Sequence, residues 1–201
     1  TAKRYGTDHH ELMISGKDIG DNLKDIVWHL DEPIANPTAG AIFLLSRLAK
    51  KDVAVVLGGD GADELFGGYR RYALSRILRS VLKMPFGLRH ILSLSLMRMG
   101  RKEASEKVLL ADSTSLFLSF LSQKEGAVTS ILNPQLTNEG IVHSHFEHYF
   151  SGIDLSGDFE KQCMNTDRQS WLIDDSLLRS DKMSMAFGLE QRVPVLDYRL
   201  M

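Results

Sequence analysis

The sequence predicts an α/β fold with a parallel sheet in its N-terminal part and a largely helical C-terminal part. Up to Tyr72, segments with helical periodicity alternate with short apolar segments, an order typical of parallel sheets with crossover helices. After Tyr72 only helical periodicity is found, and no further strand is expected. We therefore expect one domain over residues 1–201, in which residues 1–72 form part of the nucleotide-binding core and residues 73–201 are mostly helical. Because the sequence opens at Thr1 in mid-element, we expect this domain to be truncated.

The first 50 residues are expected to hold the end of a helix at Thr1–Tyr5, one strand and two further helices. His9–Ile14 is interpreted as a short strand. Asp18–Leu30 has apolar residues at the spacing of a single helix face, and Ala39–Ala49 has a second amphipathic pattern. These helices would cover a sheet.

The segment Val53–Leu57 is expected to be a central parallel strand, because it is an apolar run rich in valine that would be buried on both faces. Gly58 and Gly59 end it, and the carboxylates of Asp60, Asp63 and Glu64 follow. In open α/β sheets ligands bind beyond the carboxyl ends of the strands, and carboxylates there suit a divalent cation with phosphates. The alternative is a plain turn into a helix whose first turn is acidic.

The C-terminal part is expected to be built from several helices. Ile77–Met99 would be broken near Pro85, Ser113–Gln123 would begin with Ser113 or Thr114 as N-cap, and Met164–Met185 would be the last long element. The histidine-rich segment 143–150 has pairs of possible metal ligands on one helix face but neither HExxH spacing nor a nearby cysteine. We interpret it as a hydrated helix face with its aromatic residues turned inward.

The composition excludes several classes of protein. A net charge of −2 gives no electrostatic footprint for nucleic acid. No apolar run reaches the ~20 residues that cross a membrane. The single cysteine, Cys163, cannot form an intrachain disulfide and fits a reducing compartment, so we expect a cytoplasmic protein.

Two motifs make the sequence resemble the synthetase domain of glutamine-hydrolysing asparagine synthetases. GGDGADELFGGY, residues 58–69, is similar to that family's S-G-(D/E)-G-x-D-E-L-F-G-G-Y signature. DKMSMAFGLEQRVPVLD, residues 181–197, is similar to its K-x-x-S-M-x-x-G-(L/V)-E-x-R-V-P-F-L-D. The resemblance implies a Rossmann-like parallel sheet of the adenine nucleotide alpha hydrolase or ATP pyrophosphatase type. It also implies ATP and Mg²⁺ as cofactors.

The implied reaction adenylates the side-chain carboxylate of aspartate and then forms asparagine by attack of ammonia, with AMP and pyrophosphate as the other products. Matched to the motifs, Asp60 and Lys182 would be catalytic, and Asp63 would hold the metal. Gly58, Gly59 and Gly61 would place backbone against the nucleotide. Glu190 and Arg192 are interpreted as a structural ion pair.

The resemblance implies small-molecule substrates and a glutaminase domain of the same parent chain that supplies ammonia from glutamine. Neither that domain nor the family's S-G-G-x-D-S-S phosphate loop occurs in this sequence, and Gly58 replaces the usual serine. We therefore expect this chain to be inactive alone. A β-lactam-forming or other amidating ligase and a non-catalytic interaction domain stay open as alternatives, as does a homodimer. A magnesium-dependent phosphohydrolase is disfavoured, since no histidine lies near the acidic loop.

Overall fold

The computed structural model describes residues 2–32, 36–110, 112–121, 140–150 and 159–200. The chain forms two compact units. Unit 1 joins Thr1–Ala62 to Ser170–Met201, and unit 2 is the continuous segment Asp63–Gln169. Unit 1 therefore combines the two ends of the sequence, and both signature motifs contribute to it.

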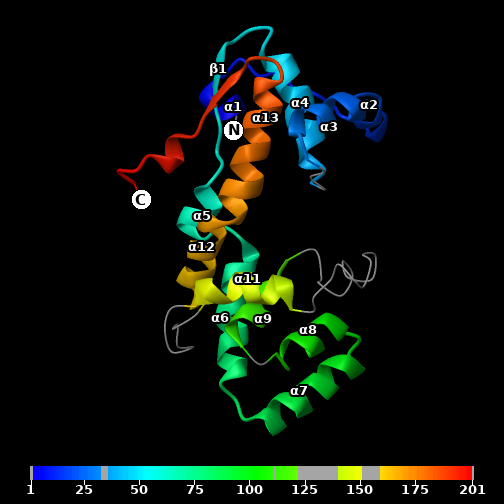
Figure 1. Cartoon of the computed structure of the whole chain (residues 1–201), viewed down its shortest axis with the longest axis vertical. Helices are drawn as coiled ribbons and strands as arrows, with labels where there is room; N and C mark the ends of the chain where they lie inside the picture. The colour runs from blue at the N-terminus through cyan, green and yellow to red at the C-terminus, as the bar shows by residue number, and fades with distance from the viewer. Residues whose placement is uncertain (1, 33–35, 111, 122–139, 151–158, 201) are drawn as a thin grey trace. The chain divides into compact units, whose positions relative to one another are not determined.

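Unit 1 places helices against a small parallel sheet. Its described helices are α1 (Ala2–Tyr5), α2 (Gly16–Asp21), α3 (Leu23–Leu30), α4 (Thr38–Ala49), the π-helix η2 (Leu172–Leu177), α13 (Leu178–Met185) and the 3₁₀-helix η3 (Pro194–Leu196). Figure 1 shows β1 (Val55–Leu57) beside the red-orange segment that carries β2 (Glu190–Arg192), with α13 alongside. The short helix α5 (Ala62–Phe66) leads from unit 1 into unit 2.

The sheet corrects two expectations. β1 pairs only with β2 among the described residues, in parallel, with Val56 opposite Gln191, so β1 is not a central strand. It is not buried on both faces either, because 73% of Leu57 is exposed. The apolar run at residues 53–57 predicted a strand correctly. How many strands pair with it depends on other segments of the chain, which this run does not specify. The expectation of no strand after Tyr72 is also wrong, since the short polar segment of β2 gave no apolar signal.

The core of unit 1 is built by α3, α4 and α13. Ile26, Leu30, Phe43, Leu44 and Met183 are buried together, and the Phe187 ring packs against the Phe43 ring in a tilted arrangement at a centroid distance of 4.6 Å. This cluster fixes α13, which carries the beginning of the second motif, against the helices of the N-terminal part.

Two N-terminal expectations need correction. The helix predicted over Asp18–Leu30 is divided at Asn22, whose side-chain Nδ2 donates to the Asp18 carbonyl at 2.7 Å. The side chain thereby bonds a carbonyl at the end of α2, and α3 starts afresh at Leu23. His9–Ile14 forms no strand, because no segment pairs with it among the described residues.

Unit 2 is helical. Its helices are α6 (Arg70–Leu82), α7 (Phe86–Arg98), α8 (Lys102–Lys107), α9 (Ser113–Leu118), α11 (Ile141–Phe150) and α12 (Phe159–Gln169). The break near Pro85 is confirmed. The N-cap of α9 is Asp112 rather than Ser113 or Thr114, because the Asp112 carboxylate accepts the Ser115 backbone N–H at 2.8 Å. The helix ends at Leu118, earlier than the predicted end at Gln123, and residues 122 and 123 lie outside the described residues.

The core of unit 2 gathers aromatic residues from distant helices. Tyr72, Leu116, Phe117, Phe150 and Phe159 are buried together. Phe146 and Tyr149 pack against this cluster, which confirms the inward aromatic face predicted for α11.

A buried polar group joins α6 to α12 in the same unit. The Tyr72 hydroxyl donates to Asp167 Oδ2 at 2.7 Å, and Arg71 Nη2 lies 2.8 Å from the same oxygen. Burial raises the pKa of the fully buried Asp167 carboxyl, although both partners oppose this shift. Removing Arg71 would leave the Asp167 carboxyl buried without its charged partner.

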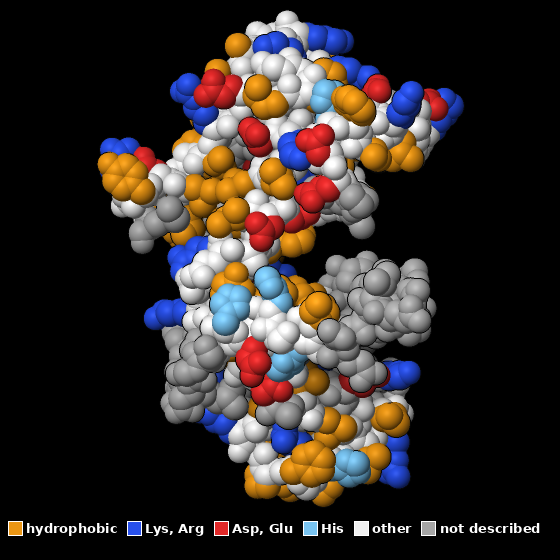
Figure 2. All heavy atoms as spheres, viewed as in Figure 1, with side chains coloured by type: hydrophobic (Ala, Val, Ile, Leu, Met, Phe, Trp, Pro, Cys, Tyr) orange, Lys and Arg blue, Asp and Glu red, His pale blue; other side chains and the backbone are white. Residues whose placement is uncertain are grey.

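On the face shown in Figure 2, Lys and Arg side chains are interspersed with Asp and Glu side chains, in keeping with the small net charge. No helix in the described part of the chain combines the length and the apolar character that a membrane crossing needs.

Cys163 provides a first testable prediction. Its side chain is 2% exposed, and burial, with a smaller contribution from the charge of Asp167, raises the pKa of its thiol to about 12. Because the thiolate is the reactive form, we expect iodoacetamide at pH 8 to modify Cys163 only as fast as the chain unfolds. Labelling followed by mass spectrometry measures the rate. A Gln169→Cys variant, exposed on the same helix, is the control and should react rapidly at its new cysteine. Equally rapid labelling of Cys163 in the folded chain would contradict this burial.

Candidate active site

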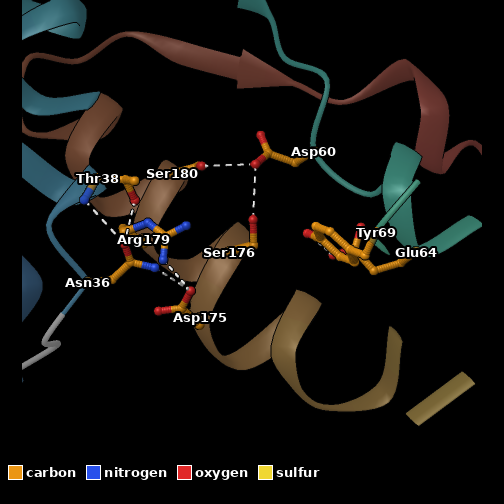
Figure 3. A network of polar contacts seen from close by, with 9 residues as sticks. All are labelled: Asn36, Thr38, Asp60, Glu64, Tyr69, Asp175, Ser176, Arg179 and Ser180. Atoms are coloured by element: carbon orange, nitrogen blue, oxygen red, sulfur yellow. Dashed lines mark hydrogen bonds and ion pairs between the residues drawn. The ribbon is translucent and has the colours of Figure 1, made fainter. Parts of the chain in front are cut away.

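Asp60 lies three residues beyond the end of β1 and is held by three neutral donors. Ser176 Oγ donates to Asp60 Oδ1 at 3.0 Å and Ser180 Oγ to the same oxygen at 3.4 Å (Figure 3). Gln191 Nε2 donates to Asp60 Oδ2 at 2.6 Å. None of these partners carries a charge, so the hydrogen bonds orient the carboxylate without neutralising it.

The two serines come from one continuous helical segment. Ser176 is in η2 and Ser180 is in α13, four positions later, so both hydroxyls lie on the same side. The π-helical turn is an unusual local geometry that is often found at functional sites. In the same segment Arg179 pairs with Asp175, which also accepts a hydrogen bond from Asn36 Nδ2 at 3.2 Å (Figure 3). The Asp175 carboxylate is thus paired with a guanidinium and with a side-chain amide.

A hollow of about 450 Å³ lies beside Asp60. Its walls are mainly apolar, from α4 and the sheet, and Ser46, Asp60, Ser180 and Gln191 supply its polar side chains. A largely apolar cavity with a few polar groups is typical of small-molecule sites.

The three glycines predicted to bind the cofactor differ in their surroundings. A Cβ on Gly58 would lie 2.3 Å from Gln191 Nε2, so Gln191 fills the space that a side chain at this position would need. No atom of the described residues lies within 4 Å of the position that a Cβ on Gly59 would take, which leaves its backbone open to a ligand. Gly61 has φ +86°, and a Cβ there would meet Leu196 at 2.3 Å. Gly61 is therefore required by the left-handed backbone conformation and by the close approach of Leu196.

Asp63 is exposed in the first turn of α5. A Cβ on Gly68 would lie 1.9 Å from Asp63 Oδ1, so this glycine allows the carboxylate to lie against the backbone. The neighbouring Glu64 is only 2% exposed and accepts a hydrogen bond from the Tyr69 hydroxyl at 2.8 Å. Glu64 is therefore a buried, hydrogen-bonded residue that links two positions of the first motif. Its role goes beyond that of a favourable charge at a helix N-terminus.

The described residues contain no group of three or more His, Cys, Asp or Glu side chains arranged to hold a metal ion. Mg²⁺ in phosphate-binding sites is usually held by one or two carboxylates together with substrate phosphates. The single exposed carboxylate of Asp63 fits that mode of binding, and it does not fit a site made by protein ligands alone.

The side chain of Lys182 does not bond Asp60 and lies at another part of unit 1. Its Nζ donates to the Leu30 carbonyl at 2.7 Å and lies 3.1 Å from Asp31 Oδ2, at the C-terminal end of α3. Since Ser180 and Lys182 are two positions apart on α13, their side chains leave the helix about 200° apart. Lys182 therefore stabilises the end of α3 in this conformation.

Glu190 and Arg192 form the ion pair that was predicted, with Arg192 Nε 2.8 Å from Glu190 Oε1. More than half of each side chain is exposed, so this pair is expected to contribute at most about 1 kcal/mol to stability.

Comparison with known proteins decides the family. The model of the asparagine synthase family matches residues 1–201. The chain belongs to the asparagine synthase family. The glutamine-hydrolyzing asparagine synthetase 1 of Bacillus subtilis strain 168 is 32% identical over 204 residues, covering 98% of this chain and 32% of that relative. Asparagine synthetase 3 of the same organism is 28% identical, covering 98% of this chain and 27% of that relative.

Similarity to some other relatives covers less of the chain. Asparagine synthetase 1 of Arabidopsis thaliana is 39% identical over 71 residues, which is 34% of this chain. This chain spans about a third of the length of the first of these relatives. No solved structure matches the chain.

Sequence reasoning missed three of the residues that complete the site, namely Ser176, Ser180 and Gln191. Ser176 and Ser180 gave a weak signal, as two hydroxyls spaced four apart just before the second motif. Gln191 occupies the variable position of E-x-R, so the motif assigned it no role.

Proposed function

We propose that this chain is the synthetase part of an ATP-dependent ligase that forms asparagine. The observation that carries the proposal is the placement of Asp60, a carboxylate of the family signature, beside a hollow and among neutral hydrogen-bond donors. Membership of the asparagine synthase family supports it. We also propose that the fold is of the ATP pyrophosphatase type, with the parallel pair β1 and β2 as part of its sheet.

The chemistry requires an activated carboxylate. The side-chain carboxylate of aspartate attacks the α-phosphorus of ATP, and pyrophosphate leaves. Ammonia then attacks the acyl carbon of the adenylate, AMP leaves, and the nitrogen gives up a proton. Asp60 is the proposed acceptor of that proton, because its hydrogen bonds leave its negative charge intact.

The remaining roles follow the two motifs. The open backbone of Gly59 is proposed to approach the nucleotide, with Gly58 and Gly61 shaping the same loop. Asp63 would hold Mg²⁺ together with phosphate oxygens. When bound, Mg²⁺ would neutralise phosphate charge. Lys182 is proposed to offset negative charge that develops during the reaction, which requires its Nζ to leave Leu30 and Asp31.

The proposed partners are small molecules and a further part of the same protein. Aspartate and ATP are the proposed substrates, and a glutaminase domain of the parent chain would supply ammonia from glutamine. The relatives bear the name glutamine-hydrolyzing and are about three times as long as this chain.

The test is an assay of the full-length protein. Incubated with Mg²⁺, ATP, aspartate and either glutamine or ammonium, it should yield asparagine, AMP and pyrophosphate in equal amounts. Omitting Mg²⁺ should stop the reaction. Formation of ADP and phosphate in place of AMP and pyrophosphate, or failure of aspartate to react, would overturn the proposal.

A separate prediction concerns the 201-residue chain on its own. We expect it to form no AMP from ATP and aspartate and to show no micromolar affinity for magnesium-ATP, since the phosphate-binding loop expected for the family is absent from this sequence. Isothermal titration calorimetry measures this directly. The full-length protein is the positive control, and micromolar binding by the chain alone would show that no further loop is needed.

A further inference from the structure

Gln191 lies at the meeting point of the two signature motifs. In β2 its side chain is the less exposed one, between the exposed Glu190 and Arg192, as expected when successive strand residues point to opposite faces. Its amide reaches the carboxylate of Asp60 and, at the same time, occupies the space beside Gly58.

The space beside Gly58 is too small for any side chain while Gln191 keeps this position. An ideal Cβ on Gly58 would lie 2.3 Å from Gln191 Nε2 and 3.0 Å from its Cδ, and such contacts are shorter than carbon and nitrogen atoms tolerate. Gly58 has no left-handed backbone conformation that would require glycine. A side chain at position 58 would therefore require the Gln191 amide to move.

The hydrogen bonds to Asp60 are divided between its two oxygens. Ser176 and Ser180 both bond Oδ1, and both come from one helical segment. The hydrogen-bond partner of Oδ2 among the described residues is Gln191, which comes from the sheet. Anchored only through Oδ1, the carboxylate could pivot about that oxygen. Gln191 removes this freedom, and as a neutral amide it leaves the charge of Asp60 intact, unlike a lysine or arginine.

We propose that Gln191 is a positioning residue for Asp60. Gly58 contributes to this role because its lack of a side chain leaves room for the Gln191 amide. The inference rests on the proposed function, in which Asp60 acts on the reacting nitrogen. It assigns a role to the variable position of the second motif and predicts that positions 58 and 191 act as a coupled pair.

The test uses the full-length protein and steady-state kinetics. We expect Gln191→Ala to lower kcat between roughly tenfold and 10²-fold, the range for a reacting group that is slightly misplaced, while KM for ATP and aspartate stays nearly constant. Gly58→Ser should also lower kcat, because it displaces the Gln191 amide. The double variant Gly58→Ser/Gln191→Ala should be no slower than the slower single variant. This non-additivity would measure the coupling.

Controls separate positioning from stability. Gln169→Ala, which truncates an exposed glutamine in unit 2, should leave kcat and thermal stability unchanged. Gln191→Asn keeps the amide but shortens its reach by one methylene, so it should fold normally and resemble Gln191→Ala in kcat. Loss of kcat only in proportion to loss of folded protein, in both Gln191 variants, would overturn the inference.

The failure of this inference can be distinguished from failure of the proposed function. If the full-length protein makes asparagine and Asp60→Asn slows it, but Gln191→Ala keeps normal kcat, the positioning role is wrong and the function stands. Fully additive effects of Gly58→Ser and Gln191→Ala would also overturn the coupling. If the full-length protein makes no asparagine, the proposed function itself fails.

Discussion

Lys182→Ala in the full-length protein is expected to reduce kcat by about 10²-fold or more, the usual cost of removing one electrostatic group that stabilises a transition state. The substrate KM values should change far less, because the proposed charge develops only during the reaction. Lys182→Arg should not restore full activity, since a planar guanidinium does not replace a compact ammonium. Steady-state kinetics of pyrophosphate release and asparagine formation measure these effects.

The contacts of Lys182 offer a competing explanation, in which it only stabilises the end of α3 through Leu30 and Asp31. Lys50 is the matched control, because its Nζ donates to the Gly188 carbonyl at 2.7 Å, a bond of the same kind and length in the same unit. If stabilising a chain carbonyl is the whole role of Lys182, Lys50→Ala and Lys182→Ala should lower the melting temperature alike and spare kcat. A folded Lys182→Ala protein with normal turnover would reject the catalytic role.

Asp60→Asn is expected to slow asparagine formation by about 10² to 10⁴-fold, the contribution that a positioned acid–base group makes. The fold should survive, since an asparagine amide has nearly the same shape, and Gln191 can still donate to its oxygen. Asparagine yield, pyrophosphate release and thermal unfolding are measured on the same protein sample.

Asp52→Asn serves as the control for Asp60→Asn. Asp52 is an exposed aspartate that precedes β1 in the same unit, and its replacement should alter neither rate nor stability. A loss of stability in Asp60→Asn that matches its loss of activity would indicate that Asp60 only maintains the hydrogen bonds to Ser176, Ser180 and Gln191.

The local signals in the sequence were sufficient for several elements of the fold. The periodicity of residues 39–49 predicted α4, the apolar run before Gly58 predicted β1, and Pro85 predicted the break between α6 and α7. Each of these depends on the conformational preference of a few neighbouring residues. β2 was missed because its three residues are polar and its strand conformation comes from pairing with β1.

The candidate site was also predictable only in part, because it too depends on contacts between distant segments of the sequence. The motif drew attention to Asp60, yet its hydrogen-bond partners lie 116, 120 and 131 positions away in the sequence. No periodicity or spacing encodes such contacts. The position of Lys182 at the end of α3 likewise follows from the packing of α13 on α3, which no local pattern specifies.

The division of the chain into an interrupted and a continuous unit has a consequence for its synthesis. Asp63–Gln169 leaves the ribosome as an uninterrupted segment, and a unit of that kind can fold as soon as it has emerged. β1 must wait for β2, which is translated roughly 10 s later at typical rates of about 5–20 residues per second. During that interval Val55 and Leu57 have no strand partner, and Asp60 has none of the three donors described here. During the same interval, the segment that later forms the candidate active site is accessible to chaperones and proteases.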